Sequence, residues 1–374
     1  MASTEIIEKQ DTRIPQLDGL RGVAVLMVVL FHYINNGYPL AEQDNLGTFE
    51  NILVKVTYFG WTGVDLFFVL SGFLIGSILF KNIGSPNFFR TFYIRRAARI
   101  IPVYFMLLIV FWVVKQTSWY QSDAYIFQKN LPLLPYFLFL QNFVMSFAGH
   151  FGPEALTPTW SLAVEEQFYL LIPLLIFYTP PRFLKYIIVA CLLGAPVARL
   201  FAHNWYEKYT ALYCRIDSPM AGILLAYLFH FPHIKKYLVN NPKKIATLLA
   251  GVVLLSGLLY RRSDPGIFNH TLLAMIFFMI IILAVTPSFR MFQTVLTNRL
   301  LVFMGSISYF FYLFHQLING LFHLLILNQK IPVIIGAPSV LVSMAAFVVT
   351  LILAVLSKRF IEQPLINASH QFLY

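Results

Sequence analysis

Residues 17–32, LDGLRGVAVLMVVLFH, form an apolar segment with an arginine near its start and a histidine at its end. Arg21 and His32 are eleven positions apart, close to three whole helical turns, so both side chains leave a helix from nearly the same face, about 16 Å apart along its axis. A snorkelling arginine and a histidine bonded to a neighbouring helix are the ordinary structural explanations for such residues in a membrane helix. Their shared face favours a functional role.

The same apolar character extends along the whole chain. Of its 374 residues, 59% are hydrophobic and 11% are charged, whereas soluble domains are about a quarter charged. Apolar runs recur from end to end, which predicts a single integral membrane domain over residues 1–374, with cytoplasmic segments at 1–18 and 358–374. The net charge of +11 falls in clusters between apolar runs, as topology signals do, so no nucleic-acid partner is expected.

Eleven apolar segments are candidate spans, and one of them must not cross the membrane. The positive-inside rule places the strongest basic loops in the cytoplasm: 81–99, 233–244 and the tail from residue 358. With the N-terminus cytoplasmic as well, the chain must cross the membrane an even number of times. The segment 131–146 is short and contains two prolines, so we expect a re-entrant or interfacial element there. The predicted fold is an all-α polytopic bundle of about ten transmembrane helices with both termini cytoplasmic. The predicted spans are 19–38, 58–80, 100–115, 160–178, 184–200, 218–231, 245–260, 271–286, 300–326 and 338–357.

Ionisable side chains occur at similar depth in several of these spans. Asp65 lies about one turn inside the second span, where an isolated carboxylate is often only a partner of the helix dipole. Under the predicted topology, His32, Asp65, Glu165 and His315 all fall in the outer half or the middle of their spans. Each would be costly against lipid, so four such groups at one depth favour a polar chamber.

Hydroxyl groups accompany these residues. Ser161 shares a helical face with Glu165, while Glu166 is turned about 100° away, so the sequence leaves open which carboxylate faces a site. Ser161, Tyr309 and Tyr312 are candidate donors to a developing oxyanion. In the second span, glycines at positions 72 and 76 predict close packing against another helix.

A basic cluster, Arg95, Arg96 and Arg99, opens the third span. Such clusters often serve only topology or contact anionic headgroups, but guanidinium groups also suit a phosphate site, and Arg21 belongs to the same layer. An acyl donor with an anionic head bound by these arginines could extend a thin arm to His32. The offset of about 16 Å is comparable to an extended pantetheine arm, so acyl-CoA is a sensible donor.

His32 is then expected to act as general base on an acceptor hydroxyl, with Asp65 or Glu165 orienting its ring and stabilising the imidazolium. A covalent acyl-histidine is the alternative. No metal is expected, because the histidines and carboxylates lie on different helices without a ligand motif such as HExxH.

Taken together, five stretches resemble membrane acyltransferase family 3, the bacterial-type O-acyltransferases that acetylate surface polysaccharides. They are LDGLRGVAVLMVVLFH with its Arg-x10-His signature, GVDLFFVLSGFLI, RRAARIIPVYF, TWSLAVEEQFYLLIP and GSISYFFYLFH, in the family order between residues 17 and 315. The resemblance implies that Arg21 binds the donor and that His32 is the catalytic histidine.

The same resemblance implies a ten-span protein of the bacterial plasma membrane that transfers an acyl group, usually acetyl. The donor would be cytoplasmic acetyl-CoA or another acyl-CoA, and the acceptor a hydroxyl of an extracytoplasmic or lipid-linked glycan, such as lipopolysaccharide O-antigen or exopolysaccharide. Many relatives add an SGNH-type esterase domain, whereas only a short tail follows the last span here. We therefore expect the chain to complete the transfer itself or to use a separate partner acyltransferase.

Two other classes of protein compete with this interpretation. Buried Arg, His, Asp and Glu also occur in proton-coupled transporters and glycan flippases, although no internal repeat is visible in the sequence. A receptor-like or scaffold protein would leave the shared depth of the ionisable groups unexplained. The acceptor is expected to be selected by the outer loops, about 39–57, 116–159, 201–217 and 261–270.

Overall fold

The computed structural model of the chain describes residues 14–35, 47–121, 123–260, 267–334 and 336–374, and these form helices and connecting turns without strands. The absence of strands follows from the long apolar runs, because a helix satisfies all of its backbone hydrogen bonds within itself. The structure confirms an all-α polytopic fold. The α-helices are α1 (Pro15–Leu30), α2 (Thr48–Thr57), α3 (Gly63–Asn82), α4 (Phe88–Lys115), α5 (Leu134–Phe137), α6 (Gln141–Ala148), α7 (Thr159–Tyr178), α8 (Pro181–Phe201), α9 (Trp205–Thr210), α10 (Leu212–Arg215), α11 (Asp217–His230), α12 (Pro232–Asn240), α13 (Pro242–Tyr260), α14 (Asn269–Ala284), α15 (Arg290–Leu296), α16 (Arg299–Leu327), α17 (Gly336–Ser357) and α18 (Gln363–Ser369).

Within the described residues, eight helical segments are long and apolar enough to cross a membrane. The predicted spans 218–231 and 271–286 correspond to the apolar helices α11 and α14, which have 14 and 16 residues and are shorter than a typical span of about 20. The segment 131–146 contains only the short helices α5 and α6, as expected of an element that does not cross.

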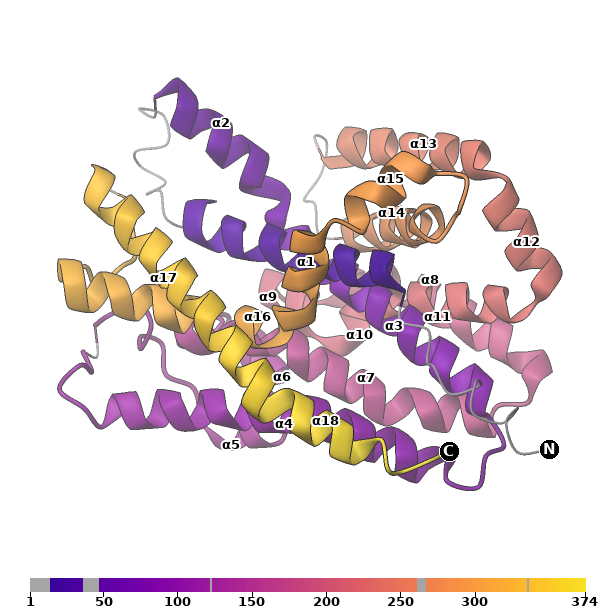
Figure 1. Cartoon of the computed structure of the whole chain (residues 1–374), viewed down its shortest axis with the longest axis horizontal. Coiled ribbons are helices and arrows are strands. Elements are labelled where there is room, and N and C mark those ends of the chain that lie inside the picture. The colour runs from indigo at the N-terminus through magenta and orange to yellow at the C-terminus, as the bar shows by residue number, and fades with distance from the viewer. Residues whose placement is uncertain (1–13, 36–46, 122, 261–266, 335) are drawn as a thin grey trace, which may run out of the picture.

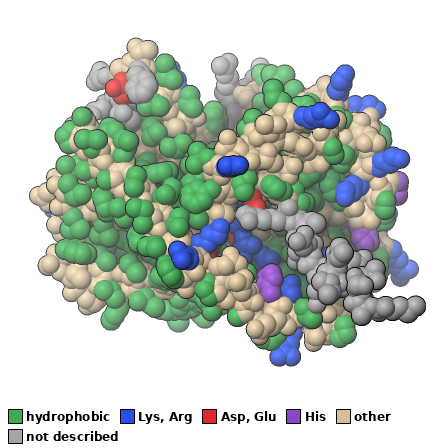
Figure 2. Space-filling view, in the orientation of Figure 1, with side chains coloured by type: hydrophobic (Ala, Val, Ile, Leu, Met, Phe, Trp, Pro, Cys, Tyr) green, Lys and Arg blue, Asp and Glu red, His purple; other side chains and the backbone are tan. Residues whose placement is uncertain are grey.

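The helices pack around a central group made of α1, α3, α11 and α16. Figure 1 shows α1 in the middle of the bundle, with α13, α14 and α15 on one side of it and α4, α5 and α7 on the other. The helix α1 packs against α16 and α3, and α3 packs against α11. Figure 2 shows hydrophobic side chains over much of one face, as a surface in contact with lipid requires.

Two helix pairs approach so closely that only glycine fits between them. A Cβ atom on Gly22 of α1 would lie 2.0 Å from the Leu301 carbonyl oxygen, and one on Gly305 of α16 would lie 1.9 Å from the Asp18 carbonyl oxygen. On α3, a Cβ atom at Gly72 would lie 1.9 Å from a carbonyl oxygen of α11, which agrees with the small-residue face expected there. These contacts fix α1 and α3 in the centre of the bundle.

The close approach predicts a matched pair of stability effects. Gly305→Ala should destabilise the protein by about 3 kcal/mol or more, because the new methyl group can fit only if two backbones separate. Gly251→Ala is the control, since this helical glycine has nothing within 4 Å of the position of a Cβ atom. It should be neutral or stabilising by up to about 1 kcal/mol, because alanine is the better helix former. Thermal unfolding in detergent measures both, and equal effects of the two substitutions would refute the packing argument.

Candidate functional site

Two cavities lie next to one another inside the bundle and share the residues Val64 and Tyr312 in their walls. The first, which we term the inner cavity, has a volume of about 100 Å³ and contains the arginines expected near the cytoplasm. The second, the outer cavity, has a volume of about 420 Å³ and contains His32. Each is far larger than the space of one water molecule. The helix α1 therefore contributes one of its two unusual polar residues to each cavity.

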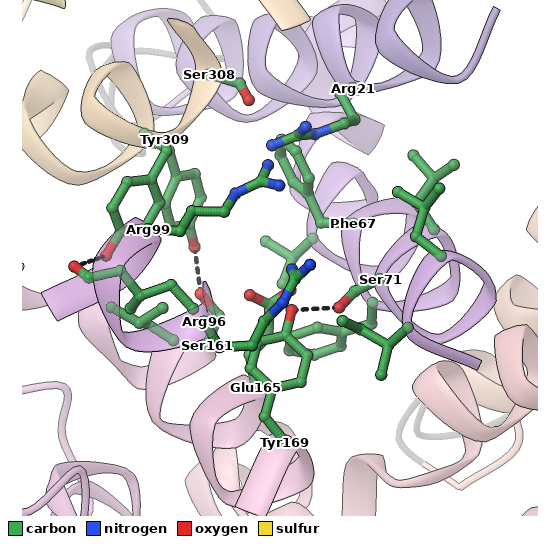
Figure 3. Close-up of a pocket in the computed structure, with 18 of the residues that line it drawn as sticks. Arg21, Phe67, Ser71, Arg96, Arg99, Ser161, Glu165, Tyr169, Ser308 and Tyr309 are labelled. Carbon is green, nitrogen blue, oxygen red and sulfur yellow. Dashed lines mark hydrogen bonds between the residues drawn. The ribbon is translucent and has the colours of Figure 1, made fainter. Parts of the chain in front are cut away.

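Three guanidinium groups and one carboxylate meet in the inner cavity. Figure 3 shows Arg21 of α1 opposite Arg96 and Arg99 of α4, with Glu165 of α7 beside them. The Arg21 side chain is 19% exposed and lies 4.0 Å from a carboxylate oxygen of Asp18. Three cations facing one carboxylate in the cavity wall suit an anionic ligand, and phosphate matches the fork geometry of guanidinium groups.

The structure distinguishes the two carboxylates that the sequence leaves open. Glu165 lines the inner cavity, whereas Glu166 is not among its lining residues and has a buried oxygen, Oε1, without a hydrogen-bond partner. Beside Glu165, the hydroxyl groups of Ser71 and Tyr169 form a hydrogen bond across the cavity wall (Figure 3). Glu165 therefore lies with the arginines and not with His32.

Of the predicted arginines, Arg95 does not line the inner cavity. Its Nη2 donates to the Phe372 carbonyl oxygen at 2.9 Å, and its guanidinium lies 5.2 Å from the centre of the Tyr374 ring. By helical phase, Arg99 points between the other two side chains, about 40° from Arg95 and about 60° from Arg96. The cavity lies on the Arg96 side of α4, and the C-terminal residues hold Arg95 on the other side. Arg96 and Arg99 therefore line the cavity, whereas Arg95 contacts the C-terminal residues.

His32 lines the outer cavity and forms a hydrogen bond to a second histidine. The His315 Nδ1 atom lies 2.6 Å from the Tyr312 carbonyl oxygen, so it must carry a proton and donate. The His315 Nε2 atom, 3.0 Å from the His32 Nδ1 atom, is then the acceptor when both rings are neutral. His32 Nδ1 then carries the proton and donates it to this bond, so the free lone pair of the His32 ring is on Nε2.

The backbone around His32 is not a regular α-helix. Residues Phe31–Asn35 continue α1 as a π-helical turn, η1. Such turns are rare and occur frequently at functional sites. A prediction from 3.6 residues per turn throughout does not anticipate this change. Tyr33, in the same turn, donates from its hydroxyl to the His315 carbonyl oxygen at 3.0 Å and fastens the turn to α16.

Aromatic side chains form much of the wall of the outer cavity. Trp205 and Tyr209 stack with ring centres 4.8 Å apart and planes 15° apart, and Trp61 and Trp160 lie nearby. Trp205 and Tyr209 come from one of the loops expected to select the acceptor, 201–217. Parts of the three other such loops, residues 39–46, 122 and 261–266, lie outside the described residues. Flat apolar faces beside a few polar groups suit a ring-shaped polar ligand.

Glu154 and Tyr125 add polar groups to the same cavity. Burial raises the pKa of the Tyr125 phenol, and the Glu154 carboxylate, its hydrogen-bond partner, raises it further. Tyr125 therefore stays protonated and donates to the carboxylate. Glu154 was not among the predicted site residues, because it lies in the 3-10 turn η4 (Glu154–Leu156) and not in a predicted span.

Asp65 lies in a buried ion pair and not against His32. Its Oδ1 atom accepts from Arg215 Nη2 at 2.8 Å and from the Ser218 hydroxyl at 3.0 Å, and His270 Nδ1 lies 3.6 Å away. The Arg215 guanidinium also lies 5.2 Å from the centre of the Tyr209 ring. The pair joins α3 to α10 and holds one wall of the outer cavity. The sequence does contain a signal for this ion pair, because Arg215 comes directly before the predicted span 218–231.

This geometry predicts that Asp65 acts through stability. Asp65→Ala should lower the free energy of unfolding by about 3–5 kcal/mol, because Arg215 would be left buried without its partner. The double variant Asp65→Ala, Arg215→Met should recover most of this loss, because no charge then stays unpaired. Thermal midpoints in detergent test both. A single variant as stable as the wild type but inactive would instead assign Asp65 to the chemistry.

Ser161, Tyr309 and Tyr312, the hydroxyl residues predicted to line the site, all line the inner cavity, but their hydroxyl groups have different partners. Ser161 and Tyr312 bond to each other at 2.7 Å beside both cavities, while the Tyr309 hydroxyl donates to the Ile100 carbonyl oxygen at 2.8 Å. In the part of the chain that the structure describes, no three His, Cys, Asp or Glu side chains are grouped so that they could hold a metal ion.

Comparisons with known proteins agree on one class of protein, the acyltransferases. A family described as "Acyltransferase domain" matches residues 14–359. The O-acetyltransferase OatA of Staphylococcus aureus strain NCTC 8325 / PS 47 is 29% identical over 380 residues, an alignment that covers 94% of this chain and 57% of OatA. OatA of strain COL matches with the same values. The chain thus spans less than two thirds of the length of these relatives. No solved structure matches it.

Proposed function

The chain belongs to membrane acyltransferase family 3, and we propose that it is an O-acetyltransferase of the bacterial plasma membrane. The proposed donor is cytoplasmic acetyl-CoA, and the proposed acceptor is a hydroxyl group of an extracytoplasmic or lipid-linked glycan. One observation carries this proposal. One continuous helical segment, α1 with its continuation η1, brings Arg21 to a cationic cavity and His32 to an aromatic cavity, and the two cavities share a wall.

The inner cavity is the proposed donor site. Arg21, Arg96 and Arg99 would bind the phosphate groups of coenzyme A, because guanidinium groups form paired hydrogen bonds with phosphate oxygens. The pantetheine arm would then run along α1 towards His32. The axial offset between Arg21 and His32, about 16 Å by helix geometry, suits an arm of that length. Glu165 would hold the arginines in position and limit their mutual repulsion.

The outer cavity is the proposed acceptor site. Trp205 and Tyr209 offer aromatic faces for a sugar ring, and Glu154 offers a carboxylate that can accept hydrogen bonds from hydroxyl groups. An acceptor bound there would be exposed to the Nε2 lone pair of His32. The aromatic lining and the small number of charged groups favour a carbohydrate over an ion.

In the proposed reaction, His32 Nε2 removes the proton of the acceptor hydroxyl as its oxygen attacks the thioester carbonyl carbon. A carbon–oxygen bond forms, the carbon–sulfur bond breaks, and the CoA thiolate takes the proton from His32 Nε2 and leaves as the thiol, so that His32 returns to its neutral form. The Nδ1–H of His32 continues to donate to His315 throughout, so His315 fixes the tautomer and the ring orientation. The hydroxyl of Tyr312, at the wall between the cavities, is the best placed of the predicted oxyanion donors.

The experiment that tests the function uses the purified chain in proteoliposomes with acetyl-CoA labelled in the acetyl group. We expect binding of the donor, and release of CoA thiol that is matched by acetyl ester on an added glycan fraction. A folded sample that binds no acetyl-CoA would overturn the donor assignment. Movement of glycan across the bilayer without consumption of acetyl-CoA would favour the transporter or flippase instead.

A further inference from the structure

The ring of Tyr312 forms part of the wall between the two cavities. Among the described residues, Val64 and Tyr312 line both cavities. The Tyr312 hydroxyl lies 2.7 Å from the Ser161 Oγ atom, and that Oγ atom lies 3.0 Å from the Pro158 carbonyl oxygen. Ser161 therefore donates to Pro158 and accepts from Tyr312. This contact ties α16 to α7 at the boundary between the cavities.

The Tyr312 ring is held less firmly than its backbone. The Tyr312 carbonyl oxygen accepts from His315 Nδ1 at 2.6 Å, so the backbone is tied to the histidine pair. The ring has one hydrogen bond, to Ser161, and contacts the rings of Phe67 and His315, whose centres lie 6.0 and 6.1 Å from its own. A single neutral hydrogen bond changes an equilibrium by only about fivefold. Empty volume on both sides gives the ring room to turn while the backbone stays in place.

From this geometry we propose that Tyr312 is a gate between the donor cavity and the acceptor cavity. With its hydroxyl on Ser161, the ring closes the passage, and when that hydrogen bond breaks, the ring turns aside and the acyl arm reaches His32. The identity of the group that passes rests on the proposed function, but the existence of the gate does not. A closed gate keeps water of the outer cavity away from a bound thioester, which would limit wasteful hydrolysis.

Thiol labelling from each side of the membrane tests the gate without any acceptor. Ser71→Cys places a thiol in the wall of the inner cavity (Figure 3), and Thr157→Cys places one in the outer cavity. Each is made in a chain whose two native cysteines, Cys191 and Cys214, are replaced by alanine. The probe is an anionic, membrane-impermeant methanethiosulfonate, added to the extracytoplasmic side or, in inverted vesicles, to the cytoplasmic side.

With Tyr312 intact, extracytoplasmic probe should label Thr157→Cys readily and Ser71→Cys slowly. Tyr312→Ala should accelerate the labelling of Ser71→Cys from this side at least tenfold. Tyr312→Phe, which keeps the ring but removes the hydrogen bond, should accelerate it a few-fold and keeps the test available if the alanine variant does not fold. The matched control is Phe303→Ala, an aromatic residue of α16 that lines neither cavity.

Labelling of Ser71→Cys from the cytoplasmic side should stay within about twofold in every background, which shows that the fold and the thiol reactivity are preserved. Two results would overturn the gate. One is rapid extracytoplasmic labelling of Ser71→Cys while Tyr312 is intact. The other is no acceleration in either Tyr312 variant. Failure of the acetyl-CoA assignment would appear separately, as absence of donor consumption by the wild type with the labelling pattern unchanged.

Discussion

Replacing His32 with alanine is expected to reduce acetyl transfer about 10³-fold, because a positioned general base typically contributes about 10²–10⁴-fold. The binding of acetyl-CoA should not change, since His32 lines the outer cavity and the arginines line the inner one. The measurement compares the turnover of labelled acetyl-CoA with its equilibrium binding. Turnover near the wild-type level, or a parallel loss of binding, would contradict the proposed role of His32.

The matched control for this variant is His323→Ala. His323 is a buried histidine of α16 whose partners are Gln329 and Ser343, and it lines neither cavity. Its removal should leave turnover within a few-fold of the wild type.

The same labelled sample distinguishes direct transfer from a covalent acyl-histidine, the two mechanisms that the sequence leaves open. Acetyl label that stays on the wild-type protein after denaturation, and is absent from the His32 variant, would favour an acyl-histidine intermediate over direct transfer.

Much of the fold could be predicted from the sequence, because a membrane segment must satisfy its backbone within one helix and must be apolar over its length. The number of crossings is harder to predict, for the same physical reason. The segments that form α11 and α14 read as spans because they are apolar, yet their 14 and 16 residues are shorter than a typical span. Hydropathy reports burial as well as contact with lipid, and it cannot separate a helix enclosed by other helices from one that faces lipid.

The candidate site was predictable where it depends on one helix. The spacing of Arg21 and His32 follows from the pitch of α1, and both side chains line cavities. The partners of these residues come from distant parts of the chain. His32 bonds to His315, 283 positions away, and Asp65 bonds to Arg215, 150 positions away. No periodicity in a single sequence connects such pairs, so the orienting role was assigned to carboxylates, whereas the structure places a histidine beside His32.

The second large effect is expected at the donor site. Arg21→Ala should weaken acetyl-CoA binding about 10- to 100-fold, because a hydrogen bond to a charged group contributes about 1.5–3 kcal/mol. Arg99→Ala should act in the same direction, since its guanidinium faces the same cavity from α4. The loss should be larger at low ionic strength, where phosphate–guanidinium attraction is less screened. Equilibrium binding of labelled acetyl-CoA at two salt concentrations measures both effects.

Arg95→Ala provides the decisive comparison. Like Arg99→Ala, it removes one positive charge from α4, but Arg95 does not line the inner cavity. Its contacts are the Phe372 carbonyl oxygen and the Tyr374 ring. Acetyl-CoA binding should therefore stay within about threefold of the wild type, a difference smaller than one charge-assisted hydrogen bond. Equal losses from Arg95→Ala and Arg21→Ala would mean that the donor responds to the general positive charge of this layer. A loss confined to Arg21 and Arg99 would mean that specific guanidinium groups bind it.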